Sequence, residues 1–138
     1  MEQTLHIIII DDDIQHNREQ SELLKQKGIS SCIKTLLNGS HALLYLEQNQ
    51  HFLNQRNTLI LLDTQMPIMN GFEFLERLKK CPYFSDKKTV VAMMLNQNSK
   101  QEIERAKDLG IQHFIHKPCC TKEINKIIQE SFAYQKVA

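Results

Sequence analysis

Short runs of aliphatic and β-branched residues alternate along the chain with longer polar stretches that carry apolar residues at helical spacing. The four isoleucines at 7–10 are typical of a strand that is buried on both faces of a sheet. Strands are predicted over residues 7–10, 29–37, 58–62, 89–95 and 111–115, and a helix is predicted after each of them. This alternation predicts an α/β fold, with a doubly wound five-stranded parallel sheet and helices on both of its faces.

Side chains that can cap helices mark several of the predicted boundaries. Ser40 and Thr121 are predicted to cap the second and the last helix. Ser99 and Glu102 have the spacing of a capping box. The amide-rich segment 48–57 carries no such signal, and we expect it to be an extended surface loop before the third strand.

Length and charge narrow the functional classes. With 138 residues, 41% hydrophobic and 24% charged, the chain is predicted to form a single domain over residues 1–138. We expect no output domain, because residues 121–138 are taken up by the last helix and a tail. Seventeen basic and sixteen acidic residues give a net charge of +1. This is not the strongly basic charge of a nucleic-acid-binding protein or a polybasic membrane anchor.

The cysteines and histidines are interpreted without a metal site or a disulfide. The four cysteines show no C-x-x-C spacing, and we expect them to be reduced thiols of a soluble, cytoplasmic protein. We expect neither a signal peptide nor a membrane span, because the apolar runs are too short. The six histidines show no ligand spacing and are interpreted as surface or partly packed side chains.

Charged residues gather at the ends of the predicted strands. Asp11, Asp12 and Asp13 follow the first strand, Asp63 ends the third, and Lys117 follows the fifth. The carboxyl ends of parallel strands lie at one edge of the sheet, where ligands bind in such folds. If the first and third strands are neighbours, the carboxylates converge and repel one another, and Mg²⁺ with its preference for oxygen ligands would relieve that repulsion. A metal, a lysine and a nucleophilic carboxylate together suit phosphoryl transfer to the carboxylate.

Each of these residues alone has a simpler interpretation. Asp13 could be only the cap of the first helix, Asp63 a loop cap, and Lys117 a surface residue. Their joint occurrence at one edge of the sheet favours the functional interpretation.

Three segments resemble the signature blocks of the response-regulator receiver domain. They are IIIIDD at 7–12, LLDTQMPIMNGFE at 61–73 and FIHKP at 114–118. The resemblance extends from Leu5 to the last helix. It implies a flavodoxin-like fold with strand order 2-1-3-4-5, an order that is known for the chemotaxis receiver. It also implies a role in two-component or phosphorelay signalling.

The resemblance assigns roles around the acidic cluster. Asp63 would be the phosphoacceptor. Asp11, Asp12 and Asp63 would hold Mg²⁺ or Mn²⁺ together with the backbone carbonyl of Gln65. The Thr64 backbone would contact the phosphoryl group.

The last strand would supply the remaining groups. Lys117 would contact the phosphoryl oxygens, and the Lys117–Pro118 peptide would be cis. Phe114 matches the aromatic switch position. The family carries Ser or Thr at the end of the fourth strand, whereas this chain has Leu95 or Asn96 there, depending on the alignment. Only the Asn96 amide could donate a hydrogen bond to a phosphoryl group.

The implied partners are a histidine kinase or a histidine phosphotransfer protein and an unknown downstream protein, with a homodimer left open and no direct nucleic acid or membrane. The chain would not be an enzyme acting on a separate substrate, although it would catalyse its own phosphorylation and dephosphorylation. One alternative is a phosphorylation-independent pseudo-receiver. Another is a haloacid-dehalogenase-like phosphatase, suggested by Asp11-x-Asp13 after a strand, although Gln15 departs from that motif.

Overall fold

The computed structural model describes residues 5–30, 32–85, 87–96 and 100–132. Its five strands form one parallel sheet in the order β2-β1-β3-β4-β5, so the predicted fold class and strand order are confirmed. The strands are β1 (His6–Ile10), β2 (Cys32–Leu36), β3 (Thr58–Asp63), β4 (Thr89–Leu95) and β5 (His113–His116).

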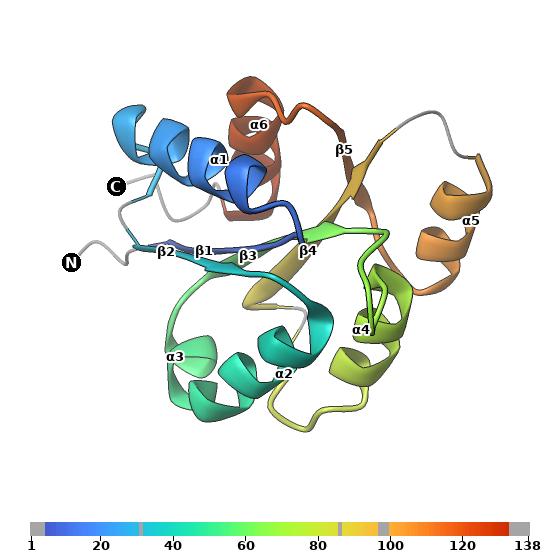
Figure 1. Ribbon diagram of the computed structural model, residues 1–138. Coiled ribbons are helices and arrows are strands. Elements are labelled where there is room, and N and C mark those ends of the chain that lie inside the picture. Colours follow the sequence, from blue (N-terminus) through green and yellow to red (C-terminus); the bar gives the residue numbers. More distant parts are fainter. Residues whose placement is uncertain (1–4, 31, 86, 97–99, 133–138) are drawn as a thin grey trace.

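Helices cover both faces of this sheet (Figure 1). They are α1 (Ile14–Gln26), α2 (Gly39–Gln48), α3 (Gln50–Gln55), α4 (Gly71–Lys79), α5 (Lys100–Asp108) and α6 (Thr121–Phe132). Residues of α1 and α6 contribute to one core cluster, and residues of α2 to α5 contribute to the other.

The isoleucine run of β1 serves both cores. Ile8 and Ile10 pack into the cluster with α2 to α5, while Ile7 and Ile9 pack into the cluster with α1 and α6. All four side chains are fully buried. Because successive side chains of a strand point to opposite faces, a sheet covered on both sides requires an apolar residue at every position. This is why the apolar residues of β1 form a continuous run in the sequence instead of alternating with polar ones.

Two predicted strands begin later than expected, for the same physical reason. Residues 29 and 111 each follow a glycine that ends a helix with positive φ, Gly28 at 68° and Gly110 at 87°. The N–H of Ile29 donates to the carbonyl of Leu24, and that of Ile111 donates to the carbonyl of Ala106, both at 3.0 Å. This is the Schellman pattern, in which the residue after the glycine still belongs to the helix end. β2 and β5 therefore begin at Cys32 and His113.

Other boundaries also differ from the predictions. The segment expected to be a loop contains the short helix α3, whose Leu53 is buried in the core. Asn38, not Ser40, caps α2, because its side chain accepts a hydrogen bond from the N–H of His41. Thr121 is the first residue of α6, and the carbonyl of Cys120 accepts from the next helical turn.

Two capping expectations remain. The interpretation of Asp13 as a helix cap is confirmed, because its side chain accepts from the N–H of His16 at the start of α1. The predicted capping residue Ser99 lies outside the described residues.

The connection from β3 to α4 holds one strained residue. Ile68 has φ of 72° while its side chain is 83% exposed. A β-branched residue in this left-handed region is a genuine outlier, and the conformation costs roughly 1–2 kcal/mol. The exposed side chain returns little of that cost through packing.

We expect Ile68→Gly to raise the free energy of unfolding by about 0.5–1 kcal/mol, because glycine adopts positive φ without strain but gains entropy in the unfolded chain. Urea unfolding followed by circular dichroism measures the change. Ile68→Val keeps the β-branched side chain and should show no gain. Equal stability of the glycine and valine variants would contradict the strain argument.

Candidate functional site

The carboxyl ends of β1 and β3 bring three aspartates together. β1 and β3 are neighbours in the sheet, with Ile10 paired to Leu62, so the residues that follow them lie side by side. Asp11, Asp12 and Asp63 each offer a carboxylate oxygen, and these oxygens lie within 4.8 Å of one another. Asp11 and Asp63 are buried, whereas Asp12 is exposed.

Lys117 reaches this cluster from the end of β5. Its Nζ lies 2.7 Å from Asp11 Oδ2 and 3.2 Å from Asp63 Oδ1. The Lys117 N–H donates to the carbonyl of Leu95 at 2.8 Å, which ties the residue to the end of β4. The peptide bond to Pro118 is cis. The structure therefore brings together the aspartates and the lysine that the sequence analysis singled out.

Crowding of these charges shifts the pKa values in opposite directions. Burial and the negative charge of Asp11 raise the pKa of Asp63 to about 6, although Lys117 partly opposes them. Burial alone would also raise the pKa of Asp11, but the contacts with His16 and Lys117 hold it well below its usual range. The two carboxylates keep the pKa of Lys117 above its usual value despite burial. In this structure Asp11 and Lys117 form a close ion pair, and the carboxyl group of Asp63 is the one that is less readily ionised.

The donor set fits a hard divalent cation. Three carboxylates face one ammonium group, and the buried Asp63 Oδ1 has only the Lys117 ammonium at 3.2 Å to offset its charge. Such an excess of oxygen ligands and negative charge is what Mg²⁺ requires. Asp11, Asp12 and Asp63 are the side chains that could hold it.

The loop after Asp63 is held by a close backbone approach. The N–H of Gly71 donates to the carbonyl of Thr64 at 3.0 Å, and a Cβ at position 71 would clash with the carbonyl oxygen of Asp63. Asn70 and Glu73 then form a capping box that starts α4. The N-G-x-E sequence thus places the first turn of α4 against the backbone of the acidic edge.

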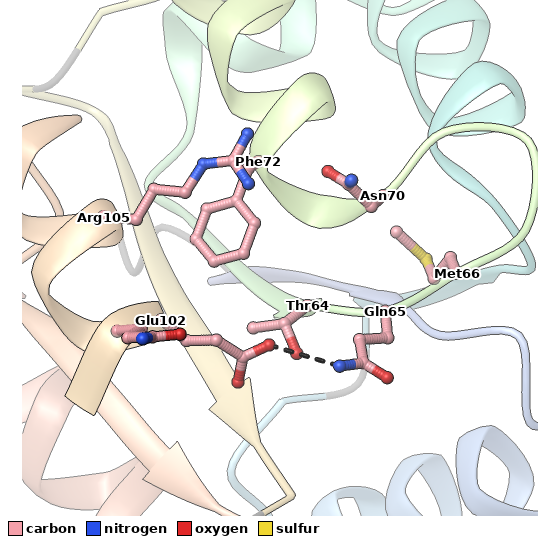
Figure 2. A pocket seen from close by; sticks show the side chains of 8 residues that line it. Thr64, Gln65, Met66, Asn70, Phe72, Glu102 and Arg105 are labelled. Atoms are coloured by element: carbon pink, nitrogen blue, oxygen red, sulfur yellow. Dashed lines mark hydrogen bonds between the residues drawn. The ribbon is translucent and has the colours of Figure 1, made fainter. Parts of the chain in front are cut away.

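A pocket of about 470 Å³ opens beside the cluster, between the β3–α4 loop and α5 (Figure 2). The guanidinium of Arg105 lies 4.4 Å from the centre of the Phe72 ring, and Gln65 Nε2 donates to Glu102 at 3.5 Å. The pocket is lined by Thr64, Gln65, Met66, Asn70, Phe72, Gln101, Glu102 and Arg105. No motif predicted that α5 would contribute to this pocket.

Neither residue at the predicted switch position at the end of β4 carries a hydroxyl group. Leu95 is the last residue of β4 and is fully buried, and Asn96 follows it and is exposed. Phe114 is half-buried in β5, paired with Met93, and packs against the core cluster on the α2–α5 face.

His16 was interpreted as a surface or partly packed residue, but it lies at the site. Its Nδ1 is 2.9 Å from Asp11 Oδ2, and its side chain is 17% exposed. The available signal was its place in the first turn of the helix that Asp13 caps, which directs it back toward the end of β1.

The chain belongs to the response regulator receiver domain family, whose model matches residues 7–129. The two-component response regulator ARR17 of Arabidopsis thaliana is 31% identical over 134 residues, which span 92% of this chain and 84% of that protein. Receivers of this family accept a phosphoryl group, bind Mg²⁺ at an acidic pocket and interact with histidine kinases or phosphotransfer proteins. They are generally signalling domains rather than enzymes.

Solved structures show the same fold. A two-component response regulator from Cytophaga hutchinsonii is 17% identical with a TM-score of 0.83, and the match covers 96% of this chain and 99% of that one. A response regulator with a GGDEF domain is also 17% identical, with a TM-score of 0.76. The match covers 96% of this chain but only 51% of that protein. Nothing in these similarities favours the phosphatase or the pseudo-receiver. No described helix is long and apolar enough to cross a membrane.

In metal-free buffer at pH 7 we expect Asp63→Asn to raise the free energy of unfolding by about 1–2 kcal/mol, because ionised Asp63 is disfavoured in the fold. The cost of ionising Asp63 in the folded state is fully present above its folded pKa of about 6 and disappears as pH falls toward its ordinary pKa of 3.8. The stability gained by Asp63→Asn should therefore shrink between pH 6 and pH 3.8. Denaturant titrations at several pH values measure it. Glu22→Gln, an exposed control, should stay within about 0.5 kcal/mol of wild type. A gain that grows on acidification would contradict the assignment.

Proposed function

We propose that Asp63 is the phosphoacceptor of this receiver and takes its phosphoryl group from a histidine of a kinase or phosphotransfer protein. The observation that carries the proposal is the position of Lys117, whose Nζ lies between the buried carboxylates of Asp11 and Asp63. An ammonium group there can neutralise phosphoryl oxygens on Asp63, as charge stabilisation of phosphoryl transfer requires.

The reaction needs a nucleophile, a cation and a defined orientation. A carboxylate oxygen of Asp63 forms a bond to phosphorus while the bond from phosphorus to the donor imidazole nitrogen breaks and leaves its electron pair on that nitrogen. Asp11, Asp12 and Asp63 are proposed to hold Mg²⁺ or Mn²⁺ with the backbone carbonyl of Gln65. The bound metal would supply neutralisation of the phosphoryl charge. Hydrolysis of the acyl phosphate by water would return the Asp63 carboxylate and inorganic phosphate.

The remaining site predictions are carried forward as part of this proposal. The Thr64 backbone contacts the phosphoryl group, and Phe114 is the aromatic group that responds to it. A cytoplasmic location is part of the same proposal, because the kinases and phosphotransfer proteins with which receivers interact must reach Asp63. The downstream target is a protein that recognises the changed surface of the phosphorylated domain.

Intact-mass spectrometry after incubation with acetyl phosphate and Mg²⁺ tests the proposal. We expect one phosphoryl adduct on the wild-type chain, no adduct on Asp63→Asn, and loss of labelling when EDTA removes the metal. Lys117→Met should reduce labelling by at least about tenfold, because the phosphoryl oxygens lose their ammonium partner.

Glu22→Gln is the matched control, since Glu22 is an exposed carboxylate of α1, and it should label like wild type. An equal adduct on Asp63→Asn would contradict Asp63 as the acceptor. A wild-type chain that neither labels nor binds beryllofluoride with Mg²⁺ would favour the pseudo-receiver. Continuous turnover of a generic phosphate ester would favour the phosphatase.

A further inference from the structure

His16 lies beside the acidic cluster but has no part in the proposed phosphoryl transfer. Its Nδ1 lies 2.9 Å from Asp11 Oδ2 and its ring is only 17% exposed, whereas its Nε2 has no hydrogen-bond partner among the described residues. Its backbone is fixed, because the His16 N–H donates to the capping side chain of Asp13 at 3.1 Å. The ring is thus held against Asp11, within hydrogen-bond distance of its carboxylate.

Asp11 accepts hydrogen bonds from several residues. Its Oδ1 accepts the N–H of Asp13 at 3.0 Å, and its backbone carbonyl accepts Asn17 Nδ2 at 2.8 Å. Its Oδ2 receives Lys117 at 2.7 Å and also has His16 beside it. Two groups that can donate to a carboxylate therefore meet at one oxygen, and one of them is redundant while Lys117 stays in place.

The proposed function removes that redundancy. Lys117 Nζ is 3.2 Å from Asp63, and a phosphoryl group on Asp63 would draw the ammonium toward its oxygens. The Asp11 side chain is only 1% exposed, so little water can replace a lost partner. A buried carboxylate oxygen left without a donor is strongly unfavourable.

We propose that His16 is a positioning residue that holds Asp11 Oδ2 through its Nδ1–H once Lys117 has turned to the phosphoryl group on Asp63. This inference rests on the proposed function. It predicts that His16 contributes little before phosphorylation and much after it, because Lys117 occupies Asp11 in the first state and leaves it in the second.

Nuclear magnetic resonance of the full chain labelled with ¹⁵N-histidine tests the contact directly. Beryllofluoride with Mg²⁺ serves as the stand-in for the phosphoryl group, and the His16 ring signals are identified by their absence from His16→Gln. We expect the His16 Nδ1–H to exchange with water more slowly once beryllofluoride is added to the Mg²⁺-saturated protein, because the contact with Asp11 then no longer competes with Lys117. Ring signals that do not change on that addition would overturn the inference.

Affinities of matched variants provide a second test. His16→Leu removes the donor at similar size, His16→Gln retains an N–H donor, and His51→Leu is a control at an exposed histidine of α3. We expect His16→Leu to weaken beryllofluoride binding, followed by ¹⁹F resonance, by about tenfold or more, while Mg²⁺ affinity by calorimetry changes by less than about threefold. His16→Gln and His51→Leu should stay within about threefold of wild type for both ligands.

The outcomes distinguish failure of this inference about His16 from failure of the proposed function. Equal loss of Mg²⁺ and beryllofluoride affinity in His16→Leu would overturn it, because His16 would then shape Asp11 in every state. Unchanged beryllofluoride affinity in that variant would also overturn it. A wild-type chain that binds Mg²⁺ but no beryllofluoride would contradict the proposed function itself, and this inference with it.

Discussion

The mutual repulsion of carboxylates at the ends of β1 and β3 is the constraint on which the site depends. Strand order makes it unavoidable, since β1 and β3 are neighbours, Asp11 directly follows β1 and Asp63 is the last residue of β3. One ammonium group, Lys117, offsets part of the charge, and the remainder makes the pocket fit for a metal ion. The fully buried sheet below supplies the rigidity that holds like charges together. The site is therefore built at a cost in stability that the two apolar cores offset.

The first turn of α1 belongs to this site as much as to the helix. Asp13 caps α1 with its side chain while its own N–H binds Asp11, and Asn17 binds the carbonyl of Asp11. Capping, helix entry and orientation of a buried carboxylate thus share the same few hydrogen bonds. A change in the contacts of Asp11 is felt at once by α1, because no flexible linker separates them.

Much of the fold could be predicted because its signals are local. The isoleucines of β1 indicated a strand buried on both faces, and strand-end charges indicated the edge where the site lies. The glycine-ended helices were harder, because a Schellman motif extends one residue past the glycine and takes the amide that a strand prediction would assign. The helix α3 was missed because its amide-rich sequence lacks a clear stripe and depends on burial of Leu53 in the core. Tertiary packing decides such a segment.

The contacts of the site with α1 differ in strength from its contacts toward α5, and the sequence predicted only some of each. Asp11 is buried and bound through backbone and side chain, so displacing it costs a hydrogen-bond network. Toward α5, Arg105 and Glu76 are about half exposed at 3.9 Å, and such a pair contributes at most about 1 kcal/mol. The Gln65–Glu102 hydrogen bond is long at 3.5 Å. These two polar contacts toward α5 are therefore weaker than the hydrogen bonds that hold Asp11 on the side of α1. Neither difference is visible in the sequence, because both depend on which side chains the fold buries.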